Sequence, residues 1–358
     1  MNRFTCSLWT SSNGEWPDIE VIDQRRLPFE ETTVRITTLE AAAEAIRNMT
    51  VRGAPLIGIT AAYGIYLALR ETLRAGDPLT DNVIEQAYQT LINTRPTAVN
   101  LRHVLDDYRQ YIQAFQGSEK LAAAFRRAEW WREADIQACS AIGDTGLPLI
   151  RHVANSHETV HILTHCNAGW LGCIEWGTAL SPIYKAHSAG ISIHVWVDET
   201  RPRNQGLLTS WELSQYGIPH TVIADNAGGL LIMEGKVHMV IVGADRISRN
   251  GDVANKIGTY LKALAAYHHR VPFYVAFPFS TFDPKSRSGS DIPIEYRPDT
   301  ELTTLRAACN GQIEHVRIMP DNTKVFNPAF DITPARYVTG YLTERGFYTP
   351  VTLHQAFA

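Results

Sequence analysis

The pattern of apolar and polar positions changes character about 145 residues into the chain. Upstream of that point, apolar residues recur with the three- to four-residue spacing of amphipathic helices. A short strand is predicted within 19–28, and helices are predicted from Thr38, from Pro55, and over 81–93, 100–115 and 119–143. Thr37 and Glu40 have the spacing of a capping box at the first helix. The pattern therefore predicts a mainly helical N-terminal domain over residues 1–145.

Downstream, short runs rich in β-branched and aromatic residues alternate with helical patterns. Strands are predicted over 159–164, 192–197, 220–224, 237–242 and 272–277. Helices are predicted between most of them, over 170–187, 207–216, 228–233 and 253–268. This succession is typical of parallel strands joined by crossover helices. Residues 146–358 are therefore expected to form an α/β domain built on an open parallel sheet.

Composition narrows the class of protein. The 358 residues carry 33 basic and 37 acidic side chains, a net charge of −4, which gives no electrostatic reason to expect nucleic-acid or membrane partners. The N-terminal residues lack the apolar core of a signal peptide, and the most apolar run, 54–69, is interrupted by Gly58 and Gly64. Five cysteines without a CxxC pair are usual in a reducing compartment. We therefore expect a cytoplasmic globular protein.

Ligands of open parallel sheets bind at the carboxyl ends of the strands, so the residues just past each predicted strand are the candidates. Cys166 follows the first strand, at the expected start of a helix, a position that lowers a thiol pKa. A lone cysteine is also often a small buried hydrophobe, and Cys173 keeps that interpretation. Asp245 follows the fourth strand. Gln205, directly before a helix, suits the hydroxyl groups of a sugar.

The stretch 253–260 adds a candidate anion site. The pattern places Asn255 and Lys256 in the first turn of a helix, where free N–H groups and the helix dipole favour a negative charge. Together with the Asp245 carboxylate, these side chains predict a site for a phosphorylated small molecule.

Metal and cofactor signatures are missing from the sequence. His161 and His165 are four residues apart, but on a strand this spacing does not bring two ligands together. The chain contains no HExxH, no paired cysteines, no EF-hand loop, no GxGxxG and no P-loop motif. We therefore expect no metal and no cofactor.

Several motifs together resemble those of the methylthioribose-1-phosphate isomerase family. They include RGAPLIG, RPTAVNL, HCNAG, GADRI, ANKIGTY and NPAFDITP, and they span residues 52–334. The wider superfamily includes ribose-1,5-bisphosphate isomerase and regulatory subunits of the nucleotide-exchange complex of translation initiation. The resemblance implies a small helical N-terminal domain, a Rossmann-like C-terminal domain with helices on both faces of the sheet, and a homodimer. It also implies cofactor-free conversion of 5-methylthioribose 1-phosphate to 5-methylthioribulose 1-phosphate in methionine salvage.

By the same resemblance, Cys166 and Asp245 correspond to the catalytic pair. The substrate-binding residues that it implies are Arg52, Gly53, Ala54, Arg95, Gln205, Asn255 and Lys256. The N-terminal domain would thus contribute Arg52 and Arg95 to the site, since arginine and lysine side chains suit a phosphate dianion.

The chemistry makes a specific demand on Asp245. We expect it to protonate the ring oxygen, while Cys166 moves the C2 proton or stabilises a hydride shift. An acid that works near pH 7 needs its carboxyl pKa raised by about 3, worth roughly 4 kcal/mol. The adjacent Arg246 opposes this change unless its side chain points away, so we expect apolar shielding of Asp245.

Departures from the family pattern leave the substituent at C5 open. After Gln205 and Gly206 the chain reads LLTS, without the arginine common in the family. Residues 225–229 read DNAGG, and Trp170 and Trp176 replace different residues. These positions admit 5-deoxyribose 1-phosphate as an alternative substrate.

Three other functions fit the sequence less well. A non-catalytic regulatory homologue would lack Cys166 and Asp245, which are both present. A ribose-1,5-bisphosphate isomerase would need extra basic residues near C5, where this chain is rich in Trp and Leu. A dehydrogenase would need the glycine fingerprint.

Overall fold

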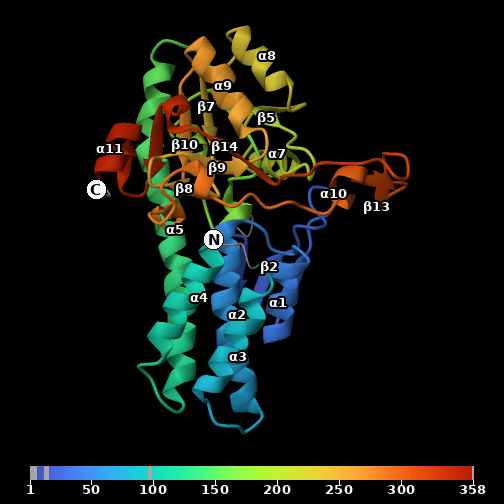
Figure 1. Ribbon diagram of the computed structural model, residues 1–358, viewed down its shortest axis with the longest axis vertical. Helices are drawn as coiled ribbons and strands as arrows, with labels where there is room; N and C mark the ends of the chain where they lie inside the picture. Colours follow the sequence, from blue (N-terminus) through green and yellow to red (C-terminus); the bar gives the residue numbers. More distant parts are fainter. Residues whose placement is uncertain (1–5, 12–15, 96–98, 357–358) are drawn as a thin grey trace. The chain divides into compact units, whose positions relative to one another are not determined.

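The computed structural model describes residues 6–11, 16–95 and 99–356, and these divide into two compact units. The first comprises Met1–Gln137 with Trp170–Glu175, and the second comprises Ala138–Gly169 with Trp176–Ala358. The domain boundary that the sequence predicts at residue 145 lies inside helix α5 (Glu119–Ala154), which is longer than predicted and contains Pro148 (Figure 1).

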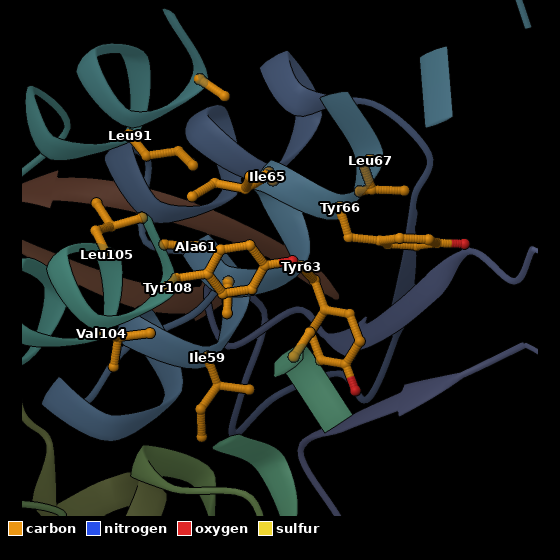
Figure 2. Packing of buried hydrophobic residues seen from close by; sticks show 14 of the residues in the cluster. Ile59, Ala61, Tyr63, Ile65, Tyr66, Leu67, Leu91, Val104, Leu105 and Tyr108 are labelled. Atoms are coloured by element: carbon orange, nitrogen blue, oxygen red, sulfur yellow. The ribbon is translucent and has the colours of Figure 1, made fainter. Parts of the chain in front are cut away.

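The first unit is built around α2 (Ala54–Arg74), whose buried residues lie on all of its faces. It packs against α1 (Leu39–Arg47), α3 (Asp81–Ile92) and α4 (Val99–Ile112). Figure 2 shows side chains of α2 packed with those of α3 and α4, including Tyr63, Tyr66, Leu91, Leu105 and Tyr108. The helices predicted for this part of the chain are confirmed, because their apolar positions do face a common core.

The start of α1 differs by one residue from the prediction. Thr38, not Thr37, is the N-cap, and its Oγ1 accepts a hydrogen bond from the Ala41 N–H at 3.1 Å. The predicted capping box is therefore wrong. Pro55 does lie in the first turn of α2, as predicted, where its missing N–H costs no helical hydrogen bond.

A small antiparallel sheet accompanies these helices. It consists of β1 (Leu8–Thr10), β2 (Ile19–Ile22) and β3 (Thr33–Ile36) in that order. Only β2 is predicted from the sequence. The strands beside it are three and four residues long, too short to show a clear alternation.

The second unit contains a seven-stranded sheet, and its α/β class confirms the prediction. All five predicted strands are present: β4 (Val160–Thr164), β5 (Ile193–Asp198), β6 (His220–Ile223), β7 (Met239–Val242) and β10 (Phe273–Ala276). The sheet order is β16-β15-β10-β7-β4-β5-β6. Every neighbouring pair is parallel except β15 (Gly340–Thr343) with β16 (Gly346–Tyr348).

The chain reverses its direction of growth across this sheet between β4 and β7. From β4 it passes to β5 and β6 on one side, and it then returns to place β7 against the other side of β4. Helices α7 (Gly206–Gln215) and α8 (Ala227–Met233) confirm two predicted helices. Side chains of α8 and α9 (Thr259–His269) pack on Leu163, Val240 and Val242 of the sheet.

The helix predicted over 170–187 is wrong. A 3-10 turn (Trp170–Gly172) and an irregular segment come first, and α6 begins only at Ser181 (Ser181–Ser188). Trp176 and Gly177 have left-handed backbone angles, φ 66° and 73°, which a continuous helix excludes. A Cβ at Gly177 would overlap the backbone of Gly169, so the chain folds tightly back on itself there.

The helix predicted over 253–268 begins six residues late. Residues Val253–Lys256 form β9, which pairs antiparallel with both β8 (Arg246–Ser248) and β14 (Phe330–Thr333). Gly258, with φ 102°, then separates this strand from α9. Local periodicity could not reveal β9, because the strand has only four residues and one of its two partners, β14, lies far along the chain.

The remaining elements are short. They are β11 (Phe282–Asp283), β12 (Thr304–Cys309), β13 (Gln312–Arg317), α10 (Thr300–Thr303), α11 (Pro350–Gln355) and 3-10 turns at Phe279–Thr281, Gly289–Asp291 and Ala335–Tyr337. Among the helices of the described residues, none has the length and apolar content to cross a membrane.

Candidate active site

Cys166 and Asp245 follow the two strands at which the sheet changes its direction of growth. Cys166 lies two residues past β4, and Asp245 three residues past β7. The Thr164 hydroxyl donates to the Ile241 carbonyl at 2.8 Å, and a Cβ at Gly243 would lie 2.8 Å from the Ala168 side chain. The exits of β4 and β7 are thus in contact. In open α/β sheets this switch point is where ligands bind.

The backbone of Cys166 is held in a left-handed conformation. Its φ is 67°, its N–H donates to Thr200 Oγ1 at 2.8 Å, and its carbonyl accepts from Thr209 Oγ1 at 2.8 Å. The prediction that Cys166 begins a helix is wrong, so the helix dipole cannot be what activates its thiol. Non-glycine residues with such angles cluster at functional sites, where the surrounding structure maintains the strain.

The side chains on both sides of Cys166 are anchored inside the second unit. Asn167 Nδ2 donates to Glu212 Oε1 at 2.8 Å and to Thr209 Oγ1 at 3.2 Å. His165 Nδ1 lies 2.8 Å from Asp198 Oδ2, and its Nε2 lies 2.8 Å from the Ile257 carbonyl oxygen. These anchors fix the segment on either side of the cysteine.

Asp245 is half-buried at the entrance to β8, and its N–H donates to the Ala254 carbonyl at 3.0 Å. Arg246, the neighbour that could oppose an acidic role, forms an ion pair with Asp283 at 3.7 Å. Burial lowers the pKa of Arg246, and the charges of Asp283 and then Asp245 oppose this change. Arg246 thus has an ion-pair partner other than Asp245.

Asn255 and Lys256 lie on β9, which corrects their predicted place in a helical turn. Asn255 is buried, and its Nδ2 donates to Thr259 Oγ1 at 3.0 Å. Lys256 Nζ donates to the Ala329 carbonyl at 3.0 Å and lies 4.9 Å from the centre of the Phe330 ring. An amide and an ammonium group thus occupy consecutive positions of one strand, in place of the helical turn that the sequence suggested.

The N-terminus of α9 already has a carboxylate on it. Asp331 accepts hydrogen bonds from the N–H groups of Gly258 at 2.7 Å and Tyr260 at 3.1 Å. Burial raises the Asp331 pKa, and these hydrogen bonds act in the opposite direction. Asn255 and Lys256 therefore do not lie at this helix start, where two N–H groups bind Asp331.

The other predicted substrate-binding residues have identifiable local roles. Gln205 is the N-cap of α7, and its carbonyl accepts from the Leu208 N–H at 3.0 Å. In the first unit, Gly53 is the N-cap of α2 and Ala54 its first residue, while Arg52 precedes them and is partly buried. Arg95 follows α3 and is also partly buried. The next three residues of its motif, 96–98, lie outside the described part of the chain.

The sequence reasoning missed three buried charged residues near these segments, Asp198, Glu212 and Lys262, and the partly buried Asp331. Asp198 ends β5, yet most of the charge in its segment was interpreted as a solvated loop. In α9 the pattern favoured Leu261 as a core residue, but Leu261 is 61% exposed and Lys262 only 3%. The available signal for Asp198 was its position at a strand end.

One group of side chains in the second unit could hold a metal ion. His165, Asp198 and Asp225 offer three ligand atoms that lie within 4.8 Å of one another. Lys262 Nζ, 2.9 Å from Asp198 Oδ2, already supplies a positive charge to this group. The expectations of no metal and no cofactor remain predictions.

These features define an α/β protein with a thiol and a carboxylate at the switch point of its main sheet. Residues 50–350 match the model of the Initiation factor 2 subunit family, and the chain belongs to that family. The methylthioribose-1-phosphate isomerase of Rhodospirillum centenum is 52% identical over 345 residues, covering 95% of this chain and 90% of that protein.

Solved structures give the same family context. The 5-methylthioribose 1-phosphate isomerase from Pyrococcus horikoshii OT3 is similar with a TM-score of 0.85 and 37% identity, covering 99% of this chain and 97% of that one. The translation initiation factor eIF-2B, subunit delta, from A. fulgidus is similar with a TM-score of 0.80 and 38% identity, covering 97% and 96%. The fold is thus similar both to a protein named as an isomerase and to a protein named as a translation initiation factor subunit.

Proposed function

We propose that this chain is a cofactor-independent aldose–ketose isomerase that converts 5-methylthioribose 1-phosphate to 5-methylthioribulose 1-phosphate. The placement of Cys166 and Asp245 after the adjacent strands β4 and β7 is the observation that carries this proposal. Relatives about half identical to this chain over nearly its full length are named methylthioribose-1-phosphate isomerase. The fold alone would not distinguish an enzyme from a regulatory subunit.

The proposed chemistry follows from the blocked anomeric position. A phosphate on O1 prevents the ring from opening through a free anomeric hydroxyl, so the ring oxygen must be protonated instead. Asp245 donates that proton as the bond between C1 and the ring oxygen breaks, and the Cys166 thiolate takes the proton from C2 to give an enediol phosphate. Cys166 then returns this proton to C1 while Asp245 accepts the proton of the 2-hydroxyl, which forms the C2 ketone and restores the acid. A thiol and a carboxyl group supply this acid–base pair without an external redox partner.

The phosphate and sugar require their own ligands. We propose that Arg52, Arg95 and Lys256 bind the phosphate, because guanidinium and ammonium groups form strong charge-assisted hydrogen bonds with it. Gly53 and Ala54 would offer backbone groups, while Gln205 and Asn255 would bind sugar hydroxyls.

We also propose that the protein is a cytoplasmic homodimer. Large apolar side chains exposed on α8 and α9, namely Leu230, Met233, Leu261 and Tyr267, support association of two copies. The five cysteines are thiols, which is consistent with a reducing compartment. Sedimentation that gave only the monomer mass at micromolar concentration would contradict the dimer.

A substrate panel tests the proposed activity. Purified protein in chelator is supplied with ribose 1-phosphate bearing methylthio, hydrogen or phosphate at C5, and ketose formation is measured. We expect turnover of the methylthio compound, with the 5-deoxy compound as the second-best substrate. Binding without turnover of any member would favour a regulatory homologue, and preference for the bisphosphate would overturn the assigned substrate.

A further inference from the structure

A charged cluster is buried directly behind Cys166. His165 and Asp198 are both fully buried, and Lys262 is 3% exposed. Asp198 Oδ2 lies 2.8 Å from His165 Nδ1 and 2.9 Å from Lys262 Nζ. Asp225 Oδ1 lies 4.0 Å from the same ring nitrogen. Four ionisable groups from separate segments of the second unit thus converge beside the cysteine.

Fold stability gives a weak reason for this cluster. Moving charged groups out of water costs several kcal/mol per ion, and well-packed apolar residues of similar size often give an equal or greater stability. A buried charge cluster at a ligand-binding strand edge is therefore a candidate for a functional role. The role of this one depends on what its hydrogen bonds connect.

The His165 ring links two segments to which the proposed function assigns different tasks. Its Nε2 faces the carbonyl oxygen of Ile257, which can only accept, so this nitrogen carries a hydrogen. Its Nδ1 faces the carboxylate oxygen that Lys262 also contacts, and donates there. Ile257 directly follows Asn255 and Lys256. One ring therefore ties the Cys166 segment to both the end of β5 and the end of β9.

The backbone at Cys166 needs such support. Its left-handed conformation costs on the order of 1 kcal/mol or more and persists only where neighbouring groups hold it. Thr200 and Thr209 bind its peptide groups, and Asn167 is bound by Glu212. The His165 ring connects this segment to Ile257, the residue that directly follows Lys256 and the end of β9.

We propose that His165 is a positioning residue, which sets the Cys166 thiol relative to the Asn255–Lys256 segment through its hydrogen bond to Ile257. Asp198 and Lys262 hold the ring in the orientation that this bond requires. The proposal rests on the proposed function, because it assigns the thiol to proton transfer and Lys256 to the phosphate. A displacement of about 1 Å between such groups can lower turnover by about a hundredfold.

Two substitutions of His165 each keep one of the two hydrogen bonds of its ring. In His165→Gln the amide nitrogen replaces Nε2 and can still donate to Ile257. In His165→Asn it replaces Nδ1 and can still donate to Asp198. We expect His165→Asn to lower kcat by about tenfold to a hundredfold, with KM changed less than about threefold, and His165→Gln to keep most of kcat. His315→Asn and His315→Gln, at an exposed position on β13, are the matched controls.

Each rate is divided by the folded fraction, measured by circular dichroism, so that a purely structural role is recognised. If His165 only stabilised the fold, the folded protein of both variants would keep the wild-type kcat, and the proposal would be overturned. A larger loss in His165→Gln than in His165→Asn would also overturn it, because the Ile257 bond would not be the one that matters.

A second readout does not depend on the substrate. The alkylation rate of Cys166 by iodoacetamide, followed by peptide mass spectrometry, is expected to change at least threefold in folded His165→Asn and less in His165→Gln, because only the first variant loses the Ile257 bond that holds the Cys166 segment in place. If the wild-type protein turned over no sugar phosphate, the proposed function would fail, and this rate alone would decide the inference. An unchanged rate would then overturn it.

Discussion

Gly53 has a backbone conformation that other residues rarely adopt, directly before α2. Its φ is 93°, and a Cβ at this position would overlap the backbone of Gly172 in the same unit. The resemblance suggested a substrate-binding role, but these two constraints already require glycine here. The structural requirement and the proposed binding role can be separated by stability measurements.

Gly53→Ala is expected to lower the free energy of unfolding by about 2 kcal/mol or more, because it adds a steric clash to an unfavourable φ. Gly76→Ala is the matched control, since Gly76 has φ 84° but a Cβ added there would meet no atom within 4 Å. It should cost only about 1 kcal/mol. Equal losses in urea unfolding would show that the Gly172 contact does not constrain position 53.

The sequence singles out Cys166 and Asp245 as candidates because each follows a strongly patterned strand, and the structure shows those strands as β4 and β7. It did not identify Lys262, since a lysine on an amphipathic helix is ordinarily solvated and Leu261 fitted the apolar face better. The burial of Lys262 depends on Asp198, which lies on another element. The residues around Lys262 in the sequence therefore carry no signal of its pairing with Asp198.

Helix α1 begins at an N-cap whose side-chain hydrogen bond is present in the structure. Thr38 Oγ1 accepts from the Ala41 N–H, while the side chain of Thr37 is exposed. Thr38→Ala should therefore lower the free energy of unfolding by about 1 kcal/mol, and Thr37→Ala by less than about 0.5 kcal/mol. Urea unfolding of the two variants checks this, and the reverse order would restore the cap predicted from the sequence.

At the level of elements, strands of the main sheet and helices of the first unit were predictable, and the segments around the site were not. Strand β9 was mistaken for the start of α9 because Val253 and Ile257 fit a helical spacing equally well. Its strand conformation comes from pairing with β8 and β14. The segment after Cys166 was likewise taken for helix, although left-handed residues at Trp176 and Gly177 interrupt it.

On the scale of the whole second unit, four histidines meet at the starting ends of the strands. This histidine cluster consists of His157, His161, His194 and His238, and its contacting pairs have ring centres 3.9 to 5.4 Å apart. Burial, and then the neighbouring histidines, lower the pKa values of His161, His194 and His238 below the ordinary 6.5. Protonation of these rings is therefore less favourable in the folded chain than in the unfolded one.

This difference gives stability a definite pH dependence. The unfolded chain binds more protons below about pH 6.5, so the stability present above that pH is lost as the pH falls through the lowered values. We expect the urea concentration at the unfolding midpoint to decrease as the pH is lowered from about 7.5 to about 5.5. The decrease should be smaller in a variant that carries both His161→Gln and His194→Gln. The exposed His354→Gln should behave like the wild type. A midpoint independent of pH in this range would contradict the prediction.

For the whole molecule, the order of patterns along the chain was sufficient for the α/β class. The topology could be predicted less directly. Residues 340–343 form β15, which lies between β16 and β10 in the sheet, and they are not among the predicted strands. From the sequence, the site could be expected only somewhere along the carboxyl ends of the parallel strands, and not specifically at the switch point between β4 and β7. The strand order in the structure is what brings Cys166 and Asp245 to neighbouring strands.

The central claim is that these two residues carry out an isomerisation on a sugar 1-phosphate, and turnover of 5-methylthioribose 1-phosphate by single variants tests it most directly. Without added cofactor, the wild type should form the ketose, and Cys166→Ala and Asp245→Asn should each lower kcat by about a hundredfold to ten-thousandfold. Cys309→Ala and the exposed Asp77→Asn are the controls and should retain wild-type rates. Near-native turnover in folded Cys166→Ala or Asp245→Asn would contradict the account.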